Sequence, residues 1–312
     1  MIVEKYGKAV KGLGGLYEIR ISDSEGISRI SCRAKGVLHR DEERVLIGDN
    51  VKLEIDTETE GSVVISEILP RKNSLIRPPM ANLDYIFVVF AAKHPAPVLE
   101  TVDKLISIAI YNKITPVVVI TKSDMSDSLA EEYRKIYELS GILTFVTSSK
   151  SGEGTEELMK YIKEQVRDGK TAAFAGASGV GKSTLMNTLF PTLALATAEI
   201  SKKIQRGKHT TRHVEIFPLS ESENTGFLAD TPGFSLIDFA RFDFMPKEAL
   251  LSTFPDLERY RGKCRYADCA HVGESADECA VAMAAREGEI AESRLISYRF
   301  IYTVLKNKKN YQ

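Results

Sequence analysis

The stretch GASGVGKS, residues 176–183, decides the fold of this chain, because it matches the phosphate-loop pattern GxxxxGK[ST] at every fixed position. An apolar segment, TAAFAG (171–176), precedes it, and a helix-compatible segment, TLMNTLF (184–190), follows it. Glycines let such a loop curl until its N–H groups point at phosphate oxygens, and the helix N-terminus adds its dipole. In this pattern Lys182 reaches the β- and γ-phosphates and Ser183 ligates Mg²⁺. The sequence therefore predicts a nucleotide-binding loop, with a chance glycine-rich turn as the alternative.

Strand and helix patterns alternate upstream of this loop. YIFVVFAA (85–92) is a continuous apolar run, as expected of a buried parallel strand, and PVVVITKSD (116–124) is a second strand that ends in a polar loop. The segment between them, 97–113, is amphipathic and helical. Helices are also expected near 128–140 and 155–167, and a strand at 142–149. This alternation indicates a parallel α/β sheet, in which ligands bind at the carboxyl ends of the strands.

Three further motifs follow predicted strands. Asp230-Thr231-Pro232-Gly233 comes after the apolar GFLA (226–229) and resembles the DxxG of GTPases, whose Asp holds Mg²⁺ through water and whose Gly amide senses the γ-phosphate. Thr121-Lys122-Ser123-Asp124 resembles the guanine-reading motif NKxD, and Thr147-Ser148-Ser149-Lys150 resembles the SAK motif that contacts guanine O6 through a backbone amide. Each of these motifs is weak alone, because turns and polar loops have similar sequences.

The Asp of the guanine-reading motif carries the base specificity. Its carboxylate accepts hydrogen bonds from N1–H and the 2-amino group of guanine, a donor pair that adenine lacks, so adenine would leave a buried charge unpaired. The Lys stem packs over the base. In this chain Thr121 replaces the usual Asn, so the contact that the Asn side-chain amide normally makes is in doubt. Asp124 is still in place.

The order of the motifs is unusual. In ordinary GTPases the phosphate loop comes first, followed by DxxG, NKxD and SAK, whereas this chain has TKSD, SSK, the phosphate loop and then DTPG. The cycle is preserved but cut at a different point, which is a circular permutation. Because the termini of a domain often lie close together, such a cut leaves the sheet and its site intact.

The N-terminal region has a different pattern. Short, partly alternating segments separated by Gly, Asp and charged turns predict about five half-buried antiparallel strands; they are 16–21, 27–34, 44–47, 50–55 and 62–68. A small barrel of the oligonucleotide/oligosaccharide-binding (OB) kind fits this count, and an SH3-like barrel would give a similar pattern. RKNSLIRPPMAN (71–82) is expected to be a linker.

The C-terminal region is helical in pattern and contains three of the four cysteines. Cys264, Cys269, His271 and Cys279 provide three thiolates and one imidazole, the ligand set of a closed tetrahedral zinc site. We therefore expect one structural Zn²⁺, with unbound cysteines in a reducing compartment as the alternative. Cys32 stands alone on a predicted strand and is expected to pack as a small apolar residue.

With these motifs in this order, the chain resembles the bacterial ribosome small subunit-dependent GTPase A family of circularly permuted GTPases, over nearly its whole length. The resemblance implies an N-terminal OB-like β-barrel, a central circularly permuted P-loop α/β GTPase domain and a C-terminal helical zinc-binding subdomain. The expected boundaries are 1–70 for the barrel, 71–82 for the linker, 83–236 for the GTPase domain and 237–312 for the zinc-binding part. The family spacing between the His and the last Cys is usually shorter by two residues, which a loop can absorb.

The resemblance also implies the activity and the site. The family hydrolyses GTP in late maturation of the 30S ribosomal subunit and contacts 16S ribosomal RNA, with Mg²⁺ at the nucleotide. The expected GTP-binding residues are Thr121, Lys122, Ser123, Asp124, Ser148, Ser149, Lys150, Gly176, Ala177, Ser178, Gly179, Val180, Gly181, Lys182, Ser183, Thr184, Asp230 and Gly233. Ser183, Asp230 and either Thr210 or Thr211 are the expected Mg²⁺ ligands.

The segment 202–213 lies between the phosphate loop and DTPG, which is the position of switch I, and it holds five Lys/Arg and no acid. Gly207-Lys208-His209-Thr210-Thr211 matches the family's GRHTT there, although a solvated basic loop is the alternative. The residue after DTPG is Phe234, where many GTPases have a water-orienting Gln. We therefore expect slow turnover that a partner stimulates, with His209 as the candidate catalytic residue that positions water.

Composition limits the partners. A net charge of −1 excludes a uniformly basic nucleic-acid coat but not a local basic patch. The longest apolar run, 86–92, is far shorter than a membrane span, so we expect a cytoplasmic protein with no membrane partner. We also expect the protein to be a monomer. The barrel itself could bind RNA, bind protein or act as a spacer. Two rival functions remain: an RNA-binding module that uses nucleotide only as a ligand, and a P-loop small-molecule kinase.

Overall fold

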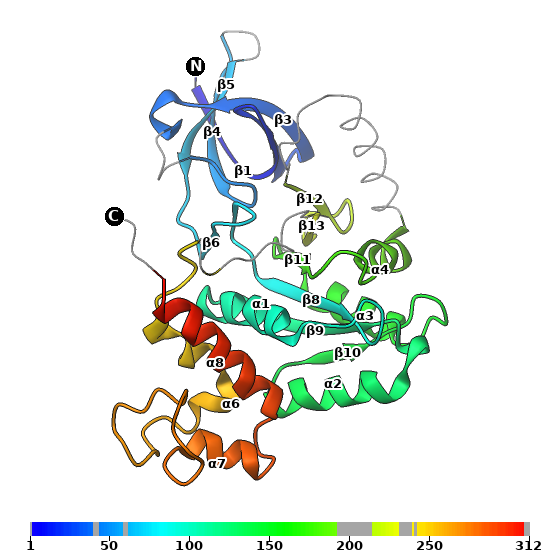
Figure 1. The fold of residues 1–312 in the computed structure, drawn as a ribbon. Coiled ribbons are helices and arrows are strands. Elements are labelled where there is room, and N and C mark those ends of the chain that lie inside the picture. The colour runs from blue at the N-terminus through cyan, green and yellow to red at the C-terminus, as the bar shows by residue number, and fades with distance from the viewer. Residues whose placement is uncertain are drawn as a thin grey trace. The chain divides into compact units, whose positions relative to one another are not determined.

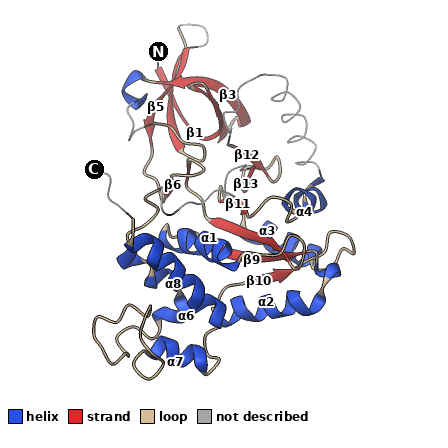
Figure 2. Cartoon of the chain, in the orientation of Figure 1, coloured by secondary structure: helices blue, strands red, loops and turns tan. Residues whose placement is uncertain are grey.

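The computed structural model describes residues 2–39, 44–58, 62–191, 214–230, 239 and 242–308. Figures 1 and 2 show the helices and strands of the chain. They fall into two compact units. Unit 1 comprises Met1–Tyr85, Met159–Phe174 and Phe190–Gly233, and unit 2 comprises Ile86–Leu158, Ala175–Leu189 and Phe234–Gln312. Each unit is therefore built from segments that are far apart in the sequence.

Unit 1 contains a closed five-stranded barrel. Its strands are β1 (Ile2–Leu13), β2 (Leu16–Asp23), β3 (Gly26–Ala34), β4 (Asn50–Asp56) and β5 (Ser62–Ile68). β1 pairs antiparallel with both β2 and β4, β2 with β3, and β4 with β5, while β3 and β5 close the barrel in parallel. This order, β1-β2-β3-β5-β4 and back to β1, is the OB arrangement, so the SH3-like alternative is excluded.

The sequence pattern locates four of the five barrel strands. The exceptions are β1, which the pattern does not predict, and 44–47, which is irregular apart from a single bridge between Ile47 and Met80. In β1 lysines and glycines interrupt the alternation, so its strand character comes from pairing with two neighbours rather than from local sequence. Gly7 illustrates this, because a Cβ there would lie 2.6 Å from the Ile19 side chain of β2.

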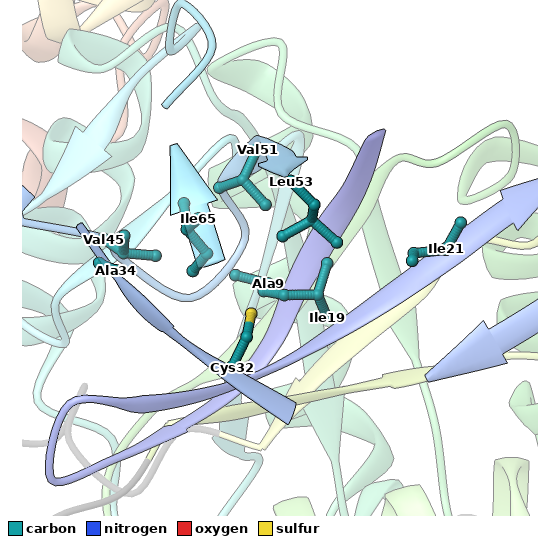
Figure 3. Close-up of a cluster of buried hydrophobic side chains, with 9 residues drawn as sticks. All are labelled: Ala9, Ile19, Ile21, Cys32, Ala34, Val45, Val51, Leu53 and Ile65. Atoms are coloured by element: carbon teal, nitrogen blue, oxygen red, sulfur yellow. The ribbon is translucent and has the colours of Figure 1, made fainter. Parts of the chain in front are cut away.

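The barrel interior is a small aliphatic core (Figure 3). It consists of Ala9, Ile19, Ile21, Cys32, Ala34, Val45, Val51, Leu53 and Ile65. Cys32 points into this core with 4% of its surface exposed, and burial raises the pKa of its thiol to about 11. The prediction that Cys32 packs as an apolar residue is thus confirmed.

Residues 71–82 are fixed to the barrel. They form a hairpin of β6 (Ser74–Leu75) and β7 (Met80–Ala81). The Arg71 guanidinium donates to both carboxylate oxygens of the fully buried Asp49, at 2.7 and 2.8 Å. A Cβ on Gly48 would lie 2.1 Å from the Ala81 carbonyl oxygen, so only glycine allows this close approach. The predicted domain boundaries themselves stay a prediction.

Three more strands continue the sheet of unit 1 beyond the barrel. They are β11 (Thr171–Ala175), whose first four residues belong to this unit, β12 (Glu215–Pro218) and β13 (Phe227–Asp230). β1 pairs antiparallel with β12, β12 pairs antiparallel with β13, and β13 pairs in parallel with β11. The barrel is thus hydrogen-bonded to the strands that lead toward the phosphate loop and the DTPG motif.

Two cations from the barrel pack on the first residue of β13. Lys8 Nζ lies 5.3 Å and Arg20 Cζ 5.6 Å from the centre of the Phe227 ring, and Phe227 is 3% exposed. Lys8 Nζ also lies 3.4 Å from Thr171 Oγ1 on β11. Burial lowers the pKa of Lys8 to about 8, although the Asp84 carboxylate favours the charged form. At neutral pH, burying the charged form of Lys8 therefore lowers the stability of the folded protein.

Unit 2 contains the strands β8 (Tyr85–Ala91), β9 (Thr115–Thr121) and β10 (Thr144–Val146), in the order β10-β9-β8. β9 and β10 pair in parallel, with Val119 opposite Phe145. Its helices are α1 (Leu99–Tyr111), α2 (Asp127–Leu139), α4 (Lys182–Leu189), α6 (Pro255–Glu258), α7 (Ala280–Arg286) and α8 (Glu292–Lys306). Helix α3 (Thr155–Gln165) begins in unit 2 and belongs to unit 1 from Met159 on. The predicted alternation of strands and helices is confirmed. Among the described residues, no helix is both long and apolar enough to cross a bilayer.

A buried arginine ties the C-terminal helices to the α/β part of unit 2. α8 packs along α1 (Figure 1), and the Arg294 guanidinium donates to Asp103 on α1 and twice to Asp256 on α6, the latter at 3.1 Å each. All three side chains are at most 1% exposed. Arg294 Cζ also lies 4.4 Å from the centre of the Phe254 ring. Two carboxylates and one aromatic face therefore compensate a single buried cation.

Replacing Arg294 should destabilise the protein strongly. Arg294→Met would leave two buried carboxylates without their cation, a change that typically costs about 3–5 kcal/mol. We expect a large drop in the urea midpoint, followed by circular dichroism. Arg286→Met is the control, because the Arg286 side chain is 57% exposed and its removal should change little. Equal midpoints for the two variants would contradict this account of Arg294.

Replacing Lys8 should stabilise the protein in a pH-dependent way. The unfolded chain holds the Lys8 proton up to about pH 10.5 and the folded chain only up to about pH 8, so wild-type stability gains with pH across this window. Lys8→Met removes the penalty and should raise the melting temperature at pH 7, by roughly 2–4 °C for each kcal/mol gained. The advantage should shrink as the pH is raised from 8 toward 10. A constant or growing advantage would contradict the lowered pKa, and Lys163→Met on the exposed side of α3 is the control.

Candidate functional site

The predicted phosphate loop lies between β11 and α4, as the motif requires. A Cβ on Gly176 would lie 2.0 Å from the Val89 carbonyl oxygen of β8, so the loop starts where only glycine fits. Gly179 and Gly181 have φ of +77° and +101°, which glycine adopts without strain. Lys182 Nζ donates to the carbonyls of Gly176 (2.9 Å) and Ala177 (2.6 Å), and burial lowers its pKa. The ammonium group is thus held inside the loop that it would use to bind phosphate.

Thr121 connects the TKSD motif to the phosphate loop. Its Oγ1 donates to the Val180 carbonyl at 2.5 Å and lies 3.2 Å from the Phe90 carbonyl. The residue is 3% exposed, so these carbonyls replace water as its partners. Thr121, which stands in place of the usual Asn, therefore makes a side-chain hydrogen bond to the phosphate loop.

Lys122 makes a second connection. It adopts a left-handed backbone conformation (φ +57°), and its Nζ donates to the carbonyls of Gly179 (2.8 Å) and His94 (2.6 Å). The side chain therefore extends along the phosphate loop to the segment after β8. The aliphatic stem of Lys122 therefore lies between the TKSD loop and the phosphate loop.

Asp124 is oriented by the SSK motif. Ser148 Oγ donates to Asp124 Oδ1 at 2.6 Å, and Lys150 Nζ lies 4.0 Å from Oδ2. Ser148 is fully buried, whereas Lys150 is exposed. The structure thus brings together two motifs that are 24 residues apart in the sequence. The hydrogen bond from Ser148 holds Oδ1 of Asp124, while the longer ion pair with Lys150 holds Oδ2 more loosely.

The SSK loop is held in shape by its own hydrogen bonds. Ser148 Oγ accepts from the N–H groups of Lys150 (3.3 Å) and Ser151 (3.2 Å), and the Ser148 N–H donates to the Glu153 carbonyl (3.0 Å). The Ser149 N–H finds no acceptor within the described residues. The SAK resemblance assigns a backbone amide of this loop to guanine O6, and the Ser149 N–H is available for that contact.

The remaining predicted nucleotide residues divide into two groups. Ala177, Ser178, Ser183 and Thr184 are exposed at the phosphate loop and the first turn of α4. Asp230 ends β13, but its side chain lies outside the description. His209, Thr210, Thr211 and Gly233 also lie outside the described residues. Their predicted roles stay predictions.

The predicted metal ligands come together in unit 2. The ligand atoms of Cys264, Cys269, His271 and Cys279 all lie within 4.8 Å of one another. His271 Nδ1 is 3.4 Å from each of the three Sγ atoms, and the Sγ atoms of Cys264 and Cys279 are 3.9 Å apart. A tetrahedral zinc ion has bonds of about 2.3 Å to sulfur and 2.0 Å to nitrogen, which place a sulfur and a nitrogen ligand about 3.5 Å apart and two sulfur ligands about 3.8 Å apart. The four residues therefore fit one tetrahedral ion.

The surroundings of these ligands also suit a metal. The N–H groups of Ala280 and Ala282 donate to Sγ of Cys264 (3.3 Å) and Cys279 (3.4 Å), which stabilises thiolates. Burial raises the pKa of Cys279 and lowers that of His271. A neutral imidazole is the form that binds metal, and buried thiolates need a cation.

Helix α8 supports the metal-ligating loop. Arg299 Nε donates to the carbonyl of His271, whose φ is +62°, and Tyr298 Oη donates to the carbonyl of Ala270. The same helix carries Arg294, so the cluster and the buried ion triad share one element. The sequence pattern predicts the four ligands but gives no signal for these supporting contacts.

Family models match most of the chain. The RsgA N-terminal domain model matches residues 6–63, and the RsgA GTPase model matches residues 68–240. The chain belongs to the RsgA GTPase family. This family assignment confirms the predicted enzyme class, a GTPase, together with the predicted family.

Curated relatives and solved structures agree with the RsgA assignment. The "Small ribosomal subunit biogenesis GTPase RsgA" of Caldanaerobacter subterraneus subsp. tengcongensis is 40% identical over 97% of this chain and 96% of its own. The RsgA of Bacillus subtilis is 35% identical, with coverages of 97% and 98%.

Two solved structures are similar to this chain. YloQ, titled a circularly permuted GTPase, matches with a TM-score of 0.75 and 28% sequence identity, over 99% of this chain and 98% of its own. YjeQ from Thermotoga maritima matches with a TM-score of 0.74 and 31% sequence identity, over 98% of this chain and 100% of its own. The predicted circular permutation and multidomain fold are confirmed.

Proposed function

We propose that this RsgA family member binds GTP at the phosphate, TKSD and SSK loops and hydrolyses it in biogenesis of the small ribosomal subunit. One observation carries the proposal: Asp124, oriented by Ser148, belongs to a loop whose Thr121 and Lys122 bind phosphate-loop carbonyls. A guanine-reading carboxylate and a phosphate site are thereby held at a fixed spacing. The names of the relatives support the ribosomal role.

The loops divide the recognition of the nucleotide. Asp124 accepts from N1–H and the 2-amino group of guanine, the Ser149 N–H donates to O6, and the Lys122 stem packs on the base. The backbone of residues 176–181 and Lys182 hold the β- and γ-phosphates. Thr121, Ser123, Ser148, Lys150 and Thr184 complete the binding set.

Mg²⁺ supplies charge neutralisation at the phosphates, and this chain offers it three oxygen ligands. They are Ser183, Asp230 through water, and either Thr210 or Thr211. The Gly233 amide senses the γ-phosphate. These roles follow from the motif positions in the sequence.

Turnover is proposed to be slow in the free protein. Phe234 cannot orient water by hydrogen bonding, and His209 is the proposed water-positioning residue. Contact with the 30S subunit, including its 16S ribosomal RNA, is proposed to stimulate the hydrolysis step. We propose that the chain acts on the subunit as a cytoplasmic monomer.

The Cys₃His cluster is proposed to hold one structural Zn²⁺. All four coordination positions are filled by protein side chains, which leaves no position for a catalytic water. The ion would stabilise the loop around Cys264–Cys279 and, through α8, the C-terminal part of unit 2.

GTP hydrolysis with and without purified 30S subunits tests the function. We expect multiple-turnover phosphate release that is slow alone and at least tenfold faster with subunits, because Phe234 supplies no water-orienting group and the partner would have to complete the site. The Asp124→Asn variant should lose affinity for GTP and gain affinity for xanthosine triphosphate, because the Asn amide can donate a hydrogen bond to the 2-oxo group of xanthine. Equal rates with and without subunits, or equal affinities of the wild type for GTP and ATP, would contradict the proposal.

Metal analysis tests the zinc site. The purified protein should contain one zinc per chain, and a strong chelator should lower its melting temperature because metal binding contributes folding free energy. Cys279→Ser should lose the zinc. Cys32→Ser, which changes a cysteine outside the cluster, should keep it. Full zinc content in Cys279→Ser would refute the ligand assignment.

A further inference from the structure

The two base-reading loops share a contact that no motif predicts. Glu153 lies just beyond the SSK motif, and its Oε2 accepts a hydrogen bond from Ser123 Oγ at 3.0 Å. Ser123 is the variable position of TKSD, directly before Asp124. The carbonyl of Glu153 also accepts from the Ser148 N–H at 3.0 Å. One residue therefore bonds both loops, with its side chain to one and its backbone to the other.

The backbone around Glu153 is built to bring it there. Gly152 and Gly154 flank it with φ of +83° and +64°, and a Cβ on Gly154 would lie 2.0 Å from the Val146 carbonyl at the end of β10. Thr155 Oγ1 closes the turn by donating to the Gly152 carbonyl at 2.7 Å. The turn thus passes directly against the strand that leads into the SSK loop.

Ser123 depends on Glu153 for its partner. Ser123 is 1% exposed, and its N–H donates to the Thr147 carbonyl at 3.2 Å. Within the described residues, Glu153 provides the acceptor for Ser123 Oγ. A buried hydroxyl without an acceptor is costly, so loss of Glu153 would favour a shifted TKSD loop. That shift would move Asp124, the next residue in the chain.

We infer that Glu153 is a positioning residue for guanine recognition, acting through Ser123 on Asp124 and through Ser148 on the SSK loop. The inference rests on the proposed guanine site. It concerns base affinity alone, because the contacts that Glu153 makes with described residues lie in the TKSD and SSK loops and not in the phosphate loop. Glu153 itself is exposed, so its replacement opens no cavity in the core and the variant should still fold.

Calorimetric titration of the full-length chain with GDP and with ADP tests this role. Glu153→Ala should weaken GDP binding about tenfold and leave ADP, which is held by its phosphates alone, unchanged. Glu153→Gln keeps an acceptor oxygen and should bind GDP within about twofold of the wild type. Glu157→Ala, an exposed acid on α3, is the matched control and should bind like the wild type. In turnover, Glu153→Ala should raise KM for GTP at constant kcat.

A double-mutant cycle identifies the route. If Glu153 acts through Ser123, then Ser123→Ala combined with Glu153→Ala should weaken GDP binding no more than the worse single variant. Unchanged GDP affinity in Glu153→Ala, parallel losses for GDP and ADP, or fully additive effects would overturn the inference. Failure of the proposed guanine site is seen separately, as a wild-type chain that binds GDP and ADP equally.

Discussion

The hydrogen bond from Thr121 to the Val180 carbonyl, with that from Lys122 to the Gly179 carbonyl, is the constraint on which the candidate site depends. The two loops follow different strands and are 59 residues apart. Their spacing has to match the length of a nucleotide from base to phosphate. Side chains of one loop that bind carbonyls of the other set this spacing directly, and the carbonyl of Val89 fixes where the phosphate loop starts.

These contacts explain why the permuted order is tolerated. Hydrogen bonds between loops depend on the positions of the atoms and not on the direction in which the chain connects them. A cut elsewhere in the sheet leaves Thr121, Val180 and Gly179 where they are. What the cut changes is the sequence neighbours of these strands, since the barrel now precedes them in the chain and the segment with the Cys₃His cluster follows them.

The sequence predicts the parts of the fold that local chemistry determines. The phosphate loop, the four metal ligands and the buried strands of unit 2 follow from fixed spacing and apolar runs. β1 escapes prediction because it is stabilised by pairing with β2, β4 and β12 rather than by alternation. Glu153 escapes for a related reason: its partner Ser123 is 30 residues away, and only the flanking glycines at 152 and 154 mark the turn.

The contacts of Lys8 and Arg294 show two ways of burying a cation. Arg294 is matched by two carboxylates and an aromatic face, so the charge is compensated where it lies. Lys8 has a hydroxyl and an aromatic ring, and the carboxylate of Asp84 only partly offsets its burial. The first arrangement favours a fixed junction of helices. The second keeps a destabilised charge where the barrel meets β11 and β13. Other contacts hold this junction together: the β1–β12 pairing and ion pair of Lys11 with Glu215, the Arg20 hydrogen bond to the Ser222 carbonyl, and the buried Phe227 ring.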